Sequence, residues 1–119
     1  MNVEDLVGIY NIKGHNQDVS QSRYEGILEL SLDQHKRIIA SWIISGNQLQ
    51  KGTGFFKDNI LVINFNYQNE EQEVFKGVVV YKCLSKDVLD GFWSEKHGHP
   101  AFLGLEQALR KEKNKLHLN

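Results

Sequence analysis

Apolar and polar residues alternate along much of this chain, which is the pattern of strands with one buried face. Residues 22–32 show it most clearly, because every second position is apolar or glycine: Tyr24, Gly26, Leu28, Leu30 and Leu32. Residues 37–45 differ, since both of their faces carry apolar side chains. We therefore expect strands that cover a core, with at least one strand that is also apolar on its other side.

Eight segments of this kind are predicted, joined by short polar connections rich in turn-forming residues. They are residues 6–14, 22–32, 37–45, 48–56 and 60–67, two strands within 75–93 around a turn at 85–87, and residues 101–108. An open sheet would leave two exposed edges, whereas a closed barrel leaves none. The prediction is an all-β, single-domain, antiparallel up-and-down barrel of about eight strands, wide enough inside for side chains or one small ligand.

Glycine recurs inside the predicted strands, beside apolar or aromatic residues. Gly8, Gly26, Gly77, Gly91 and Gly104 are of this kind. Because glycine weakens a strand and packs nothing itself, its presence there needs a reason. A closed and strongly coiled sheet supplies one, since glycines relieve crowding where strands bend.

The end of the chain allows two interpretations. Pro100 could take the first position of a helix that continues through residues 107–115. Gly104 favours a strand instead, because glycine is a poor residue for a helix interior. We predict a barrel domain over residues 1–108, followed by a basic tail over 109–119 that is a short helix or disordered.

The glycine and aromatic spacing also resembles known barrels. It consists of Gly8-x-Tyr10, Tyr24-x-Gly26-x-Leu28, Trp42, Gly52-x-Gly54, Gly77-x-Val79-x-Tyr81, Leu89-x-Gly91-x-Trp93 and Gly104-x-Glu106. This pattern resembles small bacterial β-barrel domains of uncharacterised function, and its layout is similar to the avidin and lipocalin (calycin) superfamily. The resemblance covers residues 6–106 and implies a calycin-like barrel that binds a ligand. It names no ligand, because no residue set matches the biotin site of avidins.

The composition of the chain limits the classes of partner that we expect. The net charge of −1 creates no long-range field toward nucleic acid or a membrane. The single cysteine, Cys83, excludes an intramolecular disulfide, and the first residues lack the features of a signal peptide. No apolar run is long enough to span a bilayer as a helix. We expect a soluble, cytoplasmic protein with no nucleic-acid or membrane partner and no cofactor.

Six residues are candidates for a ligand site in the barrel interior. They are Tyr10, Tyr24, Trp42, Tyr81, Trp93 and Glu106. Aromatic walls with a few polar groups are typical of pockets for small molecules, so the ligand would be small and apolar or aromatic. The alternatives are a plain aromatic core and an exposed Glu106 at the end of a strand. If Glu106 points inward beside aromatic residues, its pKa should rise.

A second apolar row lies on the opposite faces of two predicted strands. Ile39, Ile43, Val78 and Val80 would face outward from the barrel. Because monomers rarely expose large apolar patches, this row predicts a homo-oligomer, most simply a dimer formed through barrel walls. Such a module would interact through its outer face instead of its interior. A C-terminal helix packed across the row is the competing explanation.

Two further features bear on chemistry. His97 and His99 are close in a loop, but a metal site would need more ligands, from Glu95 or His15, and a solvated loop is the simpler interpretation. An enzyme with His97, His99 or Glu106 as acid and base is a third hypothesis. No catalytic constellation is visible, so we lean against enzymatic activity and predict no metal site. Cys83 is expected to be a buried, unreactive thiol.

Overall fold

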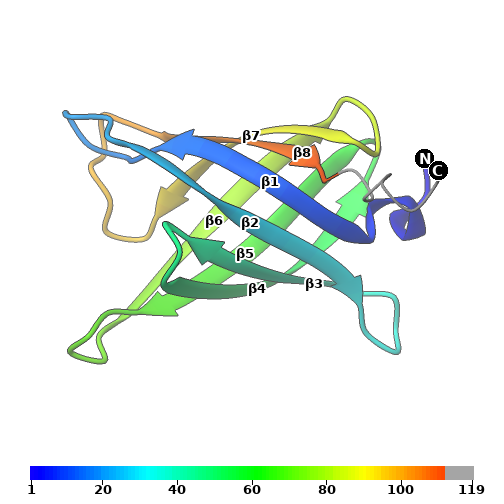
Figure 1. Ribbon diagram of the computed structural model, residues 1–119, viewed down its shortest axis with the longest axis horizontal. Helices are drawn as coiled ribbons and strands as arrows, with labels where there is room; N and C mark the ends of the chain where they lie inside the picture. Colours follow the sequence, from blue (N-terminus) through cyan, green and yellow to red (C-terminus); the bar gives the residue numbers. More distant parts are fainter. Residues whose placement is uncertain (112–119) are drawn as a thin grey trace, which may run out of the picture.

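The alternating segments fold into eight strands that pair in chain order and close on themselves (Figure 1). In this computed structural model, which describes residues 1–111, the strands are β1 (Gly8–His15), β2 (Arg23–Leu32), β3 (Ile38–Ile44), β4 (Gln48–Lys57), β5 (Ile60–Gln68), β6 (Val74–Cys83), β7 (Val88–Glu95) and β8 (Gly104–Arg110). β1 pairs with β2 on one side and with β8 on the other, so the sheet has no open edge. The predicted eight-stranded antiparallel up-and-down barrel is confirmed.

Alternation along each strand separates the interior from the surface. On β2, Leu28 and Leu30 are buried while Glu29 between them is exposed. On β5, Asn64 and Asn66 face solvent, as the pattern predicts. The core is therefore the barrel interior, and the register of each strand is fixed because a shift of one residue would exchange its two faces.

A two-residue turn joins β4 to β5. Lys57 and Ile60 are paired across it, and Asp58 and Asn59 have φ angles of 51° and 64°. Two positive φ values give the backbone twist that matches a right-twisted hairpin, and Asp and Asn tolerate this region better than most residues. The predicted turn at this position is confirmed.

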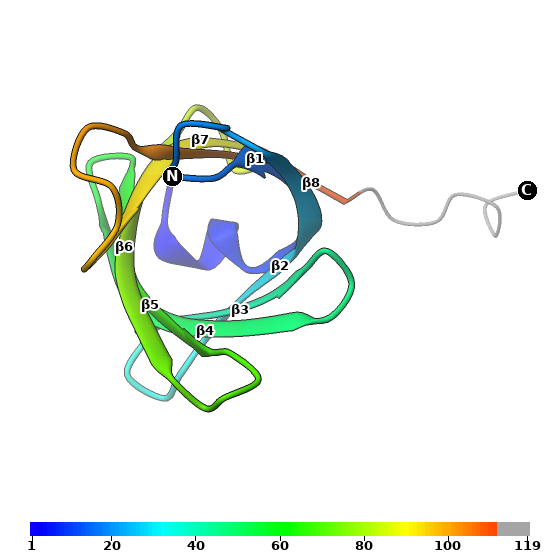
Figure 2. The same ribbon diagram turned by 90° about the vertical axis from the view of Figure 1, so that its left-hand side faces the viewer.

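The N-terminal segment differs from the prediction. Residues Val3–Leu6 form a short 3-10 helix, η1, so β1 begins at Gly8 and not at Leu6. η1 lies across one end of the barrel, which Figure 2 shows from the opposite, open end. The Leu6 side chain is fully buried there because it covers the apolar interior. The alternation of apolar residues alone could not separate η1 from the strand that follows it. Among residues 1–111, no helix has the length and apolar character to cross a bilayer.

The C-terminal helix interpretation is wrong over Gly104–Arg110, because these residues are a strand. β8 continues two residues past the predicted boundary at 108, since Tyr10 and Asn11 of β1 supply pairing partners for Arg110 and Leu109. Arg110 also donates to the backbone carbonyls of Asp5 and Val7. It thereby ties the last strand to η1 at the closed end. The predicted tail from 112 onward lies outside the described residues.

Candidate functional site

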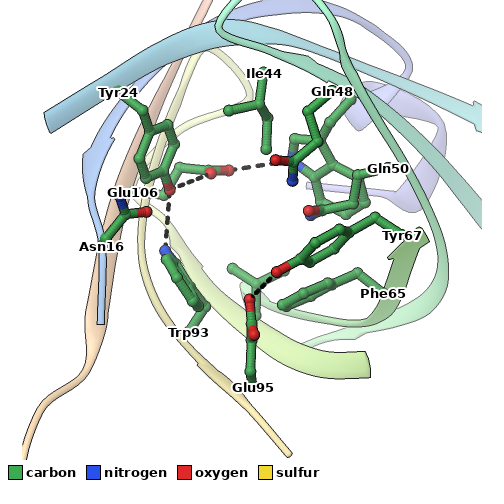
Figure 3. Close-up of a pocket in the computed structure, with 12 residues that line it drawn as sticks. Asn16, Tyr24, Ile44, Gln48, Gln50, Phe65, Tyr67, Trp93, Glu95 and Glu106 are labelled. Atoms are coloured by element: carbon green, nitrogen blue, oxygen red, sulfur yellow. Dashed lines mark hydrogen bonds between the residues drawn. The ribbon is translucent and has the colours of Figure 1, made fainter. Parts of the chain in front are cut away.

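The two halves of the barrel interior are filled differently. Aliphatic side chains such as Leu6, Leu30 and Leu61 pack the half next to η1. The other half contains a cavity of about 100 Å³ (Figure 3). Its walls are Asn16, Tyr24, Trp42, Ile44, Gln48, Gln50, Phe65, Tyr67, Val79, Trp93, Glu95 and Glu106. An outer chamber of about 260 Å³ adjoins it and shares four of these residues, so the cavity continues toward the open end.

A lateral row of five residues runs across five strands at the inner end of the cavity, and two of them, Tyr24 and Glu106, line it. Along the register, Tyr24 is paired with Gly14, Gly14 with Glu106, Glu106 with Gly91, and Gly91 with Tyr81. Both glycines leave space for a tyrosine ring, because a Cβ at either position would overlap the neighbouring ring. The two tyrosines therefore reach Glu106 from opposite sides.

Glu106 is the acceptor at the centre of this row. The Tyr24 hydroxyl donates to its Oε1 over 2.7 Å, and the Tyr81 hydroxyl and Trp42 Nε1 donate to its Oε2, the latter over 3.2 Å. Only 4% of the residue is exposed, so the interpretation of Glu106 as an exposed strand end is wrong. Burial raises the pKa of Glu106, and the three hydrogen bonds oppose that rise without cancelling it.

The hydrogen bonds extend beyond the carboxylate. Trp93 Nε1 donates to the Tyr24 hydroxyl over 2.9 Å, which links β7 to β2 across the lumen. Burial, together with the adjacent charge of Glu106, raises the pKa of Tyr24 and of Tyr81. Both tyrosines are consequently neutral donors at ordinary pH.

A second tyrosine–carboxylate pair stands at the mouth of the cavity. The Tyr67 hydroxyl donates to Glu95 Oε1, and the Tyr67 ring stacks on Phe75 with centroids 5.2 Å apart. Burial raises the pKa of Tyr67, and the hydrogen bond to Glu95 acts in the same direction. Glu95 lines both the inner cavity and the outer chamber, so its carboxylate marks the boundary between them.

The six predicted site residues divide by depth along the barrel. Tyr24, Trp42, Trp93 and Glu106 line the cavity. Tyr81 contacts Glu106 but is not part of the cavity wall. Tyr10 lies at the closed end, where its hydroxyl is 2.9 Å from the carbonyl oxygens of Leu6 and Lys86, and burial raises its pKa to about 12.

Sequence reasoning missed several polar and aromatic wall residues. They are Asn16, Gln48, Gln50, Tyr67 and Glu95. Gln50 could have been found, because it shares the inward parity of Gly52 and Gly54 on the same strand. Glu95 shares the parity of Trp93, but the predicted strand ended at residue 93.

The predicted outer row does not form one continuous patch. Ile43 and Val78 are 44% and 39% exposed, while Ile39 and Val80 are half-buried. Along the register from β3 to β6, the exposed residues Thr53 and Asn64 separate Ile39 from Val78. The apolar character of these faces is real, but polar residues interrupt it.

The two loop histidines lie outside the cavity walls. His99 Nδ1 accepts a hydrogen bond from the Ala101 backbone over 3.1 Å, and its ring packs edge-on against Phe102. Neither His97 nor His99 lines the cavity or the outer chamber. Among the described residues, no group of three or more His, Cys, Asp or Glu side chains is placed to hold a metal ion. Cys83 is buried, as predicted.

Comparison with known proteins gives likeness at the level of fold. No protein-family model matches the chain, and no curated protein sequence is significantly similar to it. Among solved structures, a redesigned β-barrel superposes with a TM-score of 0.74 at 13% identity, covering 92% of this chain and 95% of that one. Two further redesigned barrels, each bound to DFHBI, both give a TM-score of 0.67, at 17% and 16% identity. The first covers 92% of this chain and 97% of its own, and the second 89% and 99%. At these identities the likeness establishes the fold, a small eight-stranded β-barrel.

Proposed function

We propose that the protein is a non-enzymatic binding protein that takes one small, partly apolar ligand into the open half of its barrel. The observation that carries the proposal is Gln50, a residue that is only 8% exposed and lines the cavity (Figure 3). Its amide hydrogen-bonds no other residue in the described part of the chain. An amide that opens into the cavity can hydrogen-bond a molecule that enters it.

The aromatic wall supports the apolar part of the ligand. Tyr24, Trp42, Phe65 and Trp93 pack mainly edge to face or tilted against one another, with centroids 6.2 to 6.5 Å apart. Their rings are therefore held rigidly by neighbours on different strands. Rigid aromatic walls with a few polar groups are what small-molecule sites use, because little order has to be gained on binding. That barrels of the same fold have been solved with DFHBI bound is consistent with this use of the lumen.

Glu106 supports binding over catalysis. Both of its oxygens already accept hydrogen bonds, from two tyrosines and a tryptophan. Three donors occupy most of the roughly four acceptor sites of a carboxylate, which leaves Glu106 little capacity to act as a general base. We therefore assign Glu106 the role of holding the inner end of the cavity in place. The calycin-like layout is part of this proposal, supported by the Gly8-x-Tyr10 start and the up-and-down order of the strands.

Self-association through the outer wall is the second candidate function. A cross-strand row of outward apolar residues runs through Phe55, Val62, Val80, Phe92 and Leu105. Phe55, Phe92 and Leu105 are 63%, 46% and 47% exposed. This row contains Val80 of the predicted interface and is more continuous than the rest of it. Replacement of Phe92 by lysine should convert a dimer to a monomer in native mass spectrometry; a wild-type monomer would rule out this candidate.

The binding proposal is tested by filling the cavity. Val79 lines it, whereas the adjacent Val78 faces outward on the same strand, so Val79→Phe and Val78→Phe form a matched pair. With 4-methylphenol as the probe, wild type and Val78→Phe should show saturable NMR shifts at cavity residues, and Val79→Phe should show none. Equal shifts in both variants, or none in the wild type, would refute lumen binding.

A further inference from the structure

The electrostatic character of the lumen is one-sided. Glu95 and Glu106 line the inner cavity, and Asp18 lines the outer chamber. Of the described residues, 1–111, those that line either space include no lysine, arginine or histidine. An anionic ligand would meet carboxylates with no cation on the wall to balance its charge, and low-dielectric surroundings strengthen such repulsion.

The two glutamates are not equivalent. Glu106 has three donors on its two oxygens. Glu95 accepts the Tyr67 hydroxyl on Oε1, and its Oε2 hydrogen-bonds no residue in the described part of the chain. Glu95 therefore has an unused acceptor oxygen, and the residue borders the inner cavity, the outer chamber and an outer groove that also contains Lys51, Lys76 and Lys96.

The remaining wall favours a cation for an independent reason. Tyr67 and Trp93 border both spaces, and the faces of such rings attract ammonium groups through their quadrupoles. The amide of Gln50 faces the same cavity and hydrogen-bonds no other described residue, and its oxygen is an acceptor for a donor group. Aromatic faces, an amide oxygen and a free carboxylate oxygen together are complementary to a charged amine.

Size restricts the apolar part of the ligand. A cavity of about 100 Å³ is somewhat smaller than the dry cavity of roughly 150 Å³ that accommodates benzene in another protein. The inner space therefore suits a single ring once its walls relax slightly. A substituent on that ring must extend past Glu95 into the outer chamber, because the ring already fills the inner cavity.

We propose that the lumen ligand is a one-ring aromatic amine bound as its cation, with the ring in the inner cavity and the ammonium group at Glu95. This inference rests on lumen binding as the function. It names the ligand's charge and size, and it makes Glu95 the residue that selects for charge.

The test uses three probes of similar shape and different charge on the full-length protein at neutral pH. They are 2-phenylethylammonium, 2-phenylethanol and 3-phenylpropanoate, with affinities measured by calorimetry and NMR. The cation should bind about tenfold tighter than the alcohol or better, because the charge of Glu95 attracts an ammonium group and offers the neutral alcohol no comparable attraction. The carboxylate should bind more weakly than either.

Two variants test whether Glu95 is the source of the preference for the cation. Glu95→Gln keeps an oxygen for Tyr67 while it removes the charge, and should bring the cation and the alcohol to nearly equal affinity. Glu29→Gln removes the same charge from an exposed position on β2 and should leave the preference intact. Equal binding of all three probes by the wild type would overturn the inference and leave lumen binding standing. Absence of binding by every probe would refute both.

Discussion

The Tyr24 hydroxyl lies 2.7 Å from Glu106 Oε1 although 82 residues separate the two in the chain. Gly14 of β1 lies between them in the sheet, and its missing side chain is what lets the ring lean across that strand. The same arrangement recurs on the other side through Gly91 and Tyr81. A buried carboxylate held by neutral donors on both sides is thus a consequence of strand register. Several of its properties can be measured.

Glu106 should make stability depend on pH in a specific direction. Burial raises its pKa above the ordinary 4.5, so the folded protein holds this proton more tightly than the unfolded chain. Between pH 4.5 and the raised pKa, the unfolded state binds fewer protons, and stability therefore falls as pH rises. Relative to Glu106→Gln, the wild type should gain about 1.4 kcal/mol, per unit of elevation in the pKa, as pH is lowered through this window.

Urea unfolding of wild type and Glu106→Gln at a series of pH values measures this difference. Carboxylates that titrate in both proteins cancel in the comparison. Glu29→Gln, at an exposed position on β2, is the control for the loss of a surface carboxylate. A pH-independent gap between wild type and Glu106→Gln would contradict the raised pKa.

Arg110 should be hard to replace even by lysine. Its guanidinium donates to the carbonyls of Asp5, Val7 and Lys86, and it pairs with Asp87 over 2.8 Å. Lysine keeps the charge but cannot donate in several fixed directions at once. Arg110→Lys should lower the free energy of unfolding by about 2 to 4 kcal/mol, as expected when several hydrogen bonds at one site are lost together.

The matched control for that substitution is Arg37→Lys. Arg37 is exposed, and its ion pair with Asp33 spans 3.9 Å. Exposed pairs of this kind contribute about 0 to 1 kcal/mol, so thermal or urea unfolding should be almost unchanged. Similar losses in the two variants would mean that Arg110 does not secure the closed end.

Gly104 should be required for the shape of the cavity. It is paired with Trp93, and a Cβ at this position would overlap the indole ring. Gly104→Ala should push the ring into the cavity, break its hydrogen bond to Tyr24, and cost about 1 to 3 kcal/mol as overpacking does. The indole N–H resonance of Trp93 should move, while Leu105→Val, at the next and outward position, should leave it in place. An unmoved resonance in Gly104→Ala would show that the ring has room elsewhere.

Parity along each strand predicted much of this molecule, because a period of two decides which side chains enter a barrel. It indicated that Tyr24, Trp42 and Trp93 could line the barrel, but it left Glu106 open to an exposed position at a strand end, and all four residues border the cavity. Parity cannot give depth along the barrel axis, so it does not separate Tyr10, which lies at the closed end, from the residues of the open half.

The register between neighbouring strands is the second property that could not be predicted from the sequence. The row that joins Tyr24, Glu106 and Tyr81 depends on how far each strand is displaced against its neighbours. That displacement is set by closure of the whole sheet and not by any local pattern. The same holds for η1, since its covering role requires the barrel end to exist first.

The rate at which the Cys83 thiol reacts can show how often the closed end of the barrel opens. Cys83 is 4% exposed, and burial raises the pKa of its thiol to about 11 from an ordinary 9. The thiolate is the reactive form, so at a given pH the native protein should hold about 100-fold less of it than the unfolded chain, and shielding should slow the reaction further. Ellman's reagent should therefore label the native protein at least about 100-fold more slowly than the same protein in urea.

Since Arg110 ties η1 to this end, Arg110→Lys should speed native labelling, and Arg37→Lys should not. Fast labelling of the native wild type would mean that the end opens readily, and would remove the basis for treating η1 and Arg110 as its closure.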